Sequence, residues 1–80
     1  MGSKPSASSR QFAKRLGQAI RRAREAQEIS QDELAWRSEL HRAYMGFVEQ
    51  GRYDIKVVTL VQVAKGLGVK PSEILQEIGL

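Results

Sequence analysis

Hydrophobic residues return every three or four positions along most of the 80-residue chain, which is the period of an amphipathic helix. No segment alternates apolar and polar residues in the way a half-buried strand does. The pattern therefore predicts an all-α fold of five helices, over about residues 9–27, 31–38, 42–50, 57–66 and 71–78.

The first and fourth of these helices supply most of the expected core. Helix 9–27 carries one apolar stripe, made of Phe12, Leu16, Ala19, Ile20 and Ala23. Helix 57–66 is apolar almost all round, so we expect it to be the central, buried helix. Gly68 is expected to end that helix, and Pro71 suits the first turn of the last one.

Residues 30–51, SQDELAWRSELHRAYMGFVEQG, predict two short helices joined by a tight turn. Ser30 and Glu33 match an S-x-x-E capping box, which starts the first of the two. The inner face of the second is formed by Tyr44, Met45 and Val48. Two helices that cross steeply leave the outer face of the second one free, and the major groove of a DNA duplex admits one α-helix. The segment therefore predicts a helix-turn-helix.

The length and composition exclude several kinds of site. Eighty residues form one domain, which we expect to span residues 10–80 after a disordered, Ser-rich tail at 1–9. The chain has no cysteine and a single histidine, His41, so we expect no metal and no cofactor. An enzyme would need a nucleophile, a base and an orienting group in one cluster, and these residues do not predict one.

No stretch of the chain approaches the roughly 18 apolar residues of a membrane span, and Met1–Ser9 does not resemble a signal peptide. We therefore expect a cytoplasmic protein that lies with the nucleoid and has no membrane partner.

The formal net charge of +4 suits a polyanionic partner, and the distribution of the charge adds to this. Basic residues crowd the first helix and continue into the helix-turn-helix: Arg10, Lys14, Arg15, Arg21, Arg22, Arg24, Arg37, Arg42 and Arg52. The last third of the chain is nearly balanced. This asymmetry predicts one face for nucleic acid and another for a protein partner.

Four segments fall in the order of a known family: IRRAREAQEIS, QDELA, VEQG and TLVQVAKGLGVKPSEIL. From about Phe12 to Leu75 the chain resembles the phage-repressor (Xre/Cro) class of helix-turn-helix proteins. Within that class, SELHRAYMGFVEQGR is similar to controller proteins of restriction–modification systems. The resemblance implies a sequence-specific transcriptional regulator that binds a palindromic operator in double-stranded DNA, as a homodimer, through the major groove.

Three residues on the outward side of helix 42–50 are candidates for reading bases. The guanidinium of Arg42 can bond guanine O6 and N7 in a bidentate fork, although a phosphate contact or a free surface charge is the alternative. Ala43 can touch a thymine methyl. Phe47 falls between buried positions, so either a contact with thymine methyls or packing against helix 31–38 would explain it.

Five further residues are candidates for contacting DNA phosphates: Gln31, His41, Tyr44, Arg52 and Lys56. The resemblance implies that Gln31 both contacts a phosphate and braces helix 42–50; the alternative is an ordinary solvent-facing residue. Tyr44 is expected in the core, with its hydroxyl reaching a phosphate. His41 is expected either to cap helix 42–50 or to contact a phosphate. Trp36 is expected to pack over the first helix; the alternative is a phosphate contact through its indole N–H.

The resemblance also implies two structural roles. Arg24 and Glu49 match a buried ion pair that links the first helix to the end of helix 42–50 and sets its angle. Glu39 stands in the turn where the family often has a glycine in a left-handed conformation. Either Glu39 adopts a positive φ, or the turn differs from that of the family.

One helix in the groove reads only a few base pairs, so we expect two domains to pair about a two-fold axis through the fourth and fifth helices. The last helix extends an apolar stripe beyond what four helices can cover, and Leu75, Ile78 and Leu80 are the expected dimer residues. An antitoxin-like autoregulator, whose C-terminal face binds a partner protein, is the alternative function. A purely architectural DNA-binding role is a third reading, and it would show equal affinity for random and selected DNA.

Overall fold

The computed structural model of the protein describes residues 2–4, 6 and 9–80. It contains five helices: α1 (Arg10–Ala26), α2 (Gln31–Arg37), α3 (Arg42–Glu49), α4 (Val57–Leu67) and α5 (Pro71–Glu77). The predicted all-α, five-helix fold is therefore confirmed, and the predicted helix ends agree with the observed ones to within one residue. Gly68 ends α4 and Pro71 begins α5, both as predicted.

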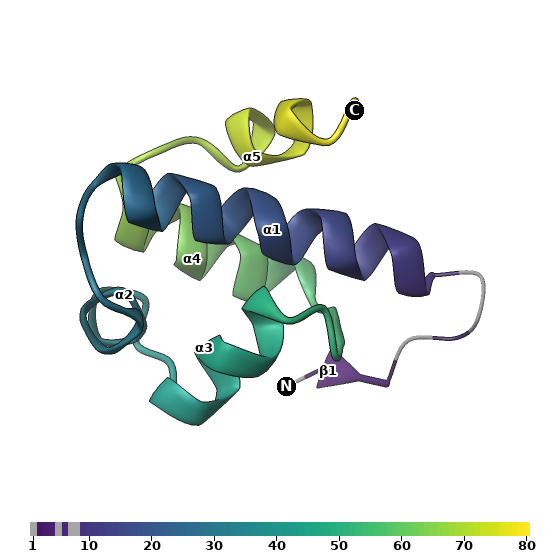
Figure 1. Ribbon diagram of the computed structural model, residues 1–80, viewed down its shortest axis with the longest axis horizontal. Coiled ribbons are helices and arrows are strands. Elements are labelled where there is room, and N and C mark those ends of the chain that lie inside the picture. Colours follow the sequence, from purple (N-terminus) through teal and green to yellow (C-terminus); the bar gives the residue numbers. More distant parts are fainter. Residues whose placement is uncertain (1, 5, 7–8) are drawn as a thin grey trace.

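The helices pack around one core. The long helix α1 crosses α4 in the middle of the molecule, with α5 on one side of this pair and α2 and α3 on the other (Figure 1). The core side chains come from all five helices, and the large apolar ones with no exposure are Ile20, Leu34, Met45 and Val63.

Two expectations about the core were wrong. Phe12 is 42% exposed instead of lying in the buried stripe of α1. Helix α4 is central but only one of its sides is buried, since Val57, Val58 and Val61 face outward. Apolar periodicity shows which side chains avoid water, but the neighbouring helices decide how many of them are covered.

The contact between α1 and α3 depends on Gly17. A Cβ atom at this position would lie 2.5 Å from the carbonyl oxygen of Val48 and 2.6 Å from that of Glu49. Real Cβ atoms do not approach backbone oxygens so closely, so any other residue would push the two helices apart. Glycine at position 17 therefore sets how near the end of α3 comes to α1.

Two short strands accompany the helices, and the sequence pattern did not predict them. Strand β1 (Gly2–Ser3) pairs antiparallel with β2 (Asp54–Ile55), with Gly2 opposite Ile55 and Ser3 opposite Asp54. The disorder expected for the tail at 1–9 stays a prediction, because Met1, Pro5, Ala7 and Ser8 lie outside the described residues.

The turn of the helix-turn-helix contains a strained residue. Glu39 has a φ of 59°, so it adopts the left-handed conformation. This was one of the two alternatives that the resemblance left open for the turn. The N–H of Glu39 donates to Trp36 O (3.1 Å) and that of Leu40 to Ala35 O (2.9 Å). This is the hydrogen-bond pattern of a Schellman motif, in which glycine usually occupies the left-handed position.

Replacing Glu39 with glycine is expected to stabilise the domain. A left-handed residue with a side chain costs about 1–2 kcal/mol, and glycine in the unfolded chain costs about 0.5–1 kcal/mol of extra entropy, so the expected net gain is about 0.5–1 kcal/mol. Chemical denaturation of Glu39→Gly against the wild type measures this gain.

The matched control is Gln18→Gly, at an exposed helical position of α1. That variant should lose about 1 kcal/mol, because its φ needs no glycine. A comparable loss of stability in Glu39→Gly would contradict the strain argued for the turn.

Candidate nucleic-acid interface

Helix α3 has one buried side and one open side. Tyr44, Met45, Val48 and Glu49 are buried, whereas Arg42 and Ala43 are exposed at its N-terminal end. Gly46 and Phe47 are partly buried. The helix therefore presents the first two predicted base-reading residues to solvent and holds the third against the domain.

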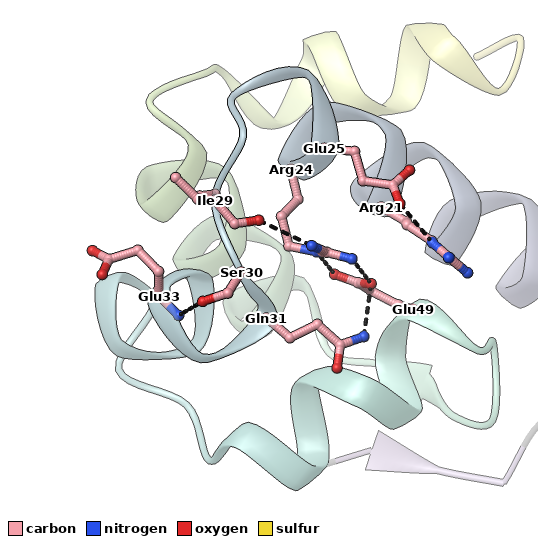
Figure 2. Close-up of polar contacts among 8 residues, drawn as sticks. All are labelled: Arg21, Arg24, Glu25, Ile29, Ser30, Gln31, Glu33 and Glu49. Carbon is pink, nitrogen blue, oxygen red and sulfur yellow. Dashed lines mark hydrogen bonds and ion pairs between the residues drawn. The ribbon is translucent and has the colours of Figure 1, made fainter.

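A cluster of hydrogen bonds fixes the end of α3 to the rest of the domain (Figure 2). The guanidinium of Arg24 donates from Nε to Glu49 Oε2 (2.7 Å) and from Nη2 to Glu49 Oε1 (3.0 Å). Its Nη1 donates to the carbonyl oxygen of Ile29 (2.9 Å). The side chains of Arg24 and Glu49 are only 12% and 2% exposed. Hydrogen bonding to Glu49 raises the pKa of Arg24, although burial of the guanidinium opposes this rise.

Gln31, the first residue of α2, joins the same cluster. Its Nε2 donates to Glu49 Oε1 at 2.9 Å (Figure 2). An amide nitrogen carries two N–H donors, so the second one remains for another acceptor. The position of Gln31 thus suits the bracing role that the resemblance implied, while its phosphate contact stays a prediction.

The helix α2 begins with half of the expected capping box. The Ser30 hydroxyl accepts a hydrogen bond from the backbone N–H of Glu33 at 3.0 Å. Among the described residues, the Glu33 carboxylate is not bonded to the Ser30 N–H and instead accepts from Arg37 Nε at 2.9 Å. The reciprocal box was therefore wrong, although the cap at Ser30 was right.

Arg42 carries a contact that the sequence analysis missed. Its Nε lies 2.5 Å from Asp32 Oδ1, and both side chains are largely exposed. An exposed ion pair of this kind contributes only about 0–1 kcal/mol, so another hydrogen-bond acceptor can displace Asp32 from the guanidinium. The acidic side chain of Asp32 could have suggested an ion pair with a nearby arginine, but which arginine it meets depends on how α2 and α3 cross.

Phe47 is held by an aromatic cluster on the loop after α3. The rings of Phe47 and Tyr53 are 5.9 Å apart, and those of Tyr44 and Tyr53 are 5.8 Å apart. The guanidinium of Arg52 lies over the Phe47 ring, 5.1 Å from its centroid. A predicted base-reading residue and a predicted phosphate-contacting residue are thus in direct contact, which neither residue type indicated by itself.

The structure places two predicted phosphate contacts differently from expectation. Tyr44 is buried, and its hydroxyl forms no hydrogen bond of normal geometry with the described residues, so it cannot reach a phosphate. Burial raises the pKa of Tyr44, and the nearby Thr59 side chain opposes that rise. His41 precedes α3 but its side chain does not cap the helix, which leaves only its predicted phosphate contact.

Arg52 and Lys56 are exposed on the segment between α3 and α4, and their phosphate contacts stay predictions. Trp36 was expected to pack over α1 but is 77% exposed. It borders a hollow of about 430 Å³ between the end of α2 and α4.

The predicted dimer residues do not form one exposed patch. Ile78 is 5% exposed and belongs to the core of its own domain, so its assignment to a dimer contact was wrong. Leu75 is partly buried against the same core. Only Leu80 is largely exposed. The apolar stripe at the end of the chain is therefore mostly used inside the domain.

Among the described residues, no group of three or more His, Cys, Asp or Glu side chains is arranged to hold a metal ion. The same part of the chain includes no helix that could span a membrane.

A family model described as a helix-turn-helix domain matches residues 15–76. The chain belongs to the helix-turn-helix family. The control protein C.BamHI of Bacillus amyloliquefaciens is 33% identical over 61 residues, which cover 75% of this chain and 75% of that protein. The immunity repressor protein of Bacillus phage phi105 is 36% identical over 62 residues, which cover 78% of this chain and 43% of the repressor.

A solved structure of the restriction-modification controller protein C.AhdI from Aeromonas hydrophila is also similar to this helix-turn-helix protein. The TM-score is 0.78 at 34% sequence identity, with 80% of this chain and 97% of that chain covered. These relatives are regulators and control proteins rather than enzymes. The chain is accordingly a DNA-binding transcriptional regulator and not an enzyme, as the sequence predicted.

Removing one partner of the Arg24–Glu49 pair is expected to destabilise this helix-turn-helix protein strongly. Arg24→Ala leaves the buried Glu49 charge without its guanidinium, which typically costs about 3–5 kcal/mol. The matched control is Arg21→Ala, which breaks the exposed Arg21–Glu25 pair and should cost less than about 1 kcal/mol. Thermal and chemical denaturation compare the two.

Because Arg24→Ala can unfold so small a domain, the double variant Arg24→Met/Glu49→Leu provides a second test. It removes both buried charges and should recover most of the lost stability. Equal stability of Arg24→Ala and Arg21→Ala would contradict the role of the buried pair.

Asp32→Asn is expected to tighten DNA binding about two- to fivefold at low salt. The substitution frees the Arg42 guanidinium from an exposed pair contributing up to about 1 kcal/mol and removes a negative charge next to the DNA-binding surface. Fluorescence anisotropy with a labelled duplex measures the change. Glu33→Gln removes the same charge from α2 and releases Arg37 instead, so an equal effect in both variants would show that the Arg42 pair is not responsible.

Proposed function

We propose that this regulator binds a palindromic operator as a homodimer, with α3 of each protomer in the major groove. The observation that carries the proposal is the exposed N-terminal end of α3, with Arg42 and Ala43 side by side, on a helix anchored through Glu49. A reading helix must be both accessible and held at a constant angle, and α3 combines these properties.

In this proposal Arg42 reads a guanine through O6 and N7, after exchanging Asp32 for the base. Ala43 contacts a thymine methyl. Phe47 reaches the same groove from the aromatic cluster with Tyr53, where its partly buried ring is already oriented. The three residues together cover only a few base pairs, which is why one protomer is insufficient.

Phosphate contacts then set the register of α3 in the groove. Gln31 offers its second amide N–H at the start of α2, and His41 lies before α3. Arg52 and Lys56 offer exposed cations after α3, and Lys56 also stands at the N-terminus of α4, where backbone N–H groups favour an anion.

Two protomers must place their α3 helices about 34 Å apart, one duplex turn, in order to read a palindrome. Among the large apolar side chains that the domain leaves exposed, we propose those of α4 and the C-terminal residue for such pairing: Val57, Val58, Val61 and Leu80. This set replaces Ile78, which the domain's own core uses. With duplex DNA as its partner, the protein would lie in the cytoplasm with the nucleoid.

Selection of bound sites from random duplex DNA tests the proposal, and we expect a palindrome with half-sites about one duplex turn apart. Arg42→Ala should then weaken operator binding by about 1–3 kcal/mol with little change on random DNA, because it removes a base contact. Arg52→Ala, the matched control, should weaken binding to both by a similar factor, because phosphates carry no sequence information. A single unpaired half-site, together with a monomer in sedimentation at micromolar concentration, would contradict the dimer.

A further inference from the structure

A basic hollow lies beside the loop that follows α3, outside the residues assigned to base reading. It has a volume of about 350 Å³ and is lined by Lys4, Arg10, Lys14, Gln50, Gly51 and Arg52. Four of these six residues are cations, and no carboxylate is among them. Only Arg52 has a part in the function proposed above. The other three cations, Lys4, Arg10 and Lys14, have no function assigned to them so far.

Gly51 brings the loop and α1 together at this hollow. Its φ of 73° is left-handed, and a Cβ at this position would lie 2.6 Å from Lys14 Cα and 2.8 Å from Lys14 N. The loop backbone therefore rests directly on the second turn of α1. Arg10 and Lys14 are four residues apart on that helix, so they share one of its faces, and Arg52 follows Gly51 beside them.

Lys4 reaches the hollow because the chain before α1 is attached to the loop before α4. Ser3 pairs with Asp54 in the β1–β2 ladder, and Lys4 is the next residue. The Ser9 hydroxyl donates to Asp54 Oδ2 at 2.9 Å, which fastens the same segment a second time. This carboxylate is thus used by Ser9 and is not part of the hollow's lining.

Cations gathered without a counter-charge repel one another, so the hollow favours an anion. The hollow next to it indicates which kind of anion this would be. A second hollow of about 330 Å³ runs along α1 to Gln31, and it shares Lys14 and Gln50 with the first. In that second hollow the carboxylate of Glu49 is already engaged by Arg24 and Gln31. Because the two hollows share these two lining residues, they adjoin one another between Gln31 and Lys4, and cations spread over that length suit a linear polyanion better than an isolated ion.

We propose that Lys4, Arg10, Lys14 and Arg52 bind the phosphodiester backbone of DNA flanking the bases that α3 reads. The N-terminal segment thereby adds a second backbone clamp to the one at Gln31 and lengthens the protein's footprint on the duplex. This inference rests on the proposed function, since it takes duplex DNA as the partner of the same face.

The test measures the affinity of the full chain for the selected operator and for random duplex between about 50 and 200 mM salt. Lys4→Ala, Arg10→Ala and Lys14→Ala should each lower the slope of log affinity against log salt by about 0.9, because each removes one phosphate contact. The loss of affinity should be the same factor on operator and random DNA. Lys70→Ala, an exposed cation at the start of α5, is the matched control and should leave the slope unchanged.

A second measurement locates the contact on the DNA. Replacing flanking phosphates one at a time with neutral methylphosphonates should weaken wild-type binding at the contacted position. The same replacement should cost Lys14→Ala much less, since its partner is already missing. The three cations are exposed, and thermal unfolding of each variant verifies that the fold is intact.

Unchanged slopes in all three variants, with operator preference retained by the wild type, would overturn the clamp and leave the proposed function standing. That result would also be the one expected if the hollow served an acidic protein surface instead of DNA. Absence of any operator preference in the wild type would overturn the proposed function, while reduced slopes on random DNA would still support the clamp.

Discussion

The carboxylate of Glu49 accepts three hydrogen bonds from two other elements, two from Arg24 on α1 and one from Gln31 at the start of α2. A charge with only 2% exposure cannot be solvated by water, so these donors are the condition for placing Glu49 there at all. The orientation of α3 follows from this constraint. Glu49 ends α3, and its carboxylate can meet both partners only when the helix lies at one angle to α1 and α2.

The glycine at position 17 makes the same constraint possible. Without a side chain there, the backbone at Val48 and Glu49 approaches α1 closely enough for the guanidinium of Arg24 to reach the carboxylate at 2.7 Å. The close packing at Gly17 and the ion pair with Arg24 thus both fix the position of Glu49 at the end of α3. These contacts hold the C-terminal end of α3 against the domain, whereas the N-terminal end exposes Arg42 and Ala43 to solvent.

The exposed charges around this rigid centre behave differently. Arg42 pairs with Asp32, Arg21 with Glu25 and Arg37 with Glu33, all on the surface, where each pair contributes little and water can solvate the separated charges. The buried pair therefore maintains structure, whereas the surface cations remain available. This division agrees with the proposed contacts to DNA phosphates, whose affinity falls as the salt concentration rises.

The sequence by itself determined the elements that depend on neighbours along the chain. Helical periodicity, the Ser30 cap, the stop at Gly68 and Pro71 at the start of α5 are local signals, and the helix bounds followed from them. The order of these signals also carried the resemblance, and with it the helix-turn-helix and the pairing of Arg24 with Glu49.

Only the tertiary structure decided which of several equivalent side chains are covered or paired. Ile78 and Phe12 are both apolar residues on amphipathic helices, yet the domain buries the first and leaves the second partly exposed. Asp32 meets Arg42, and Lys4 joins Arg52, across ten and forty-eight residues of chain. Such contacts depend on how helices cross and where loops return, and periodicity along the sequence contains no information about either.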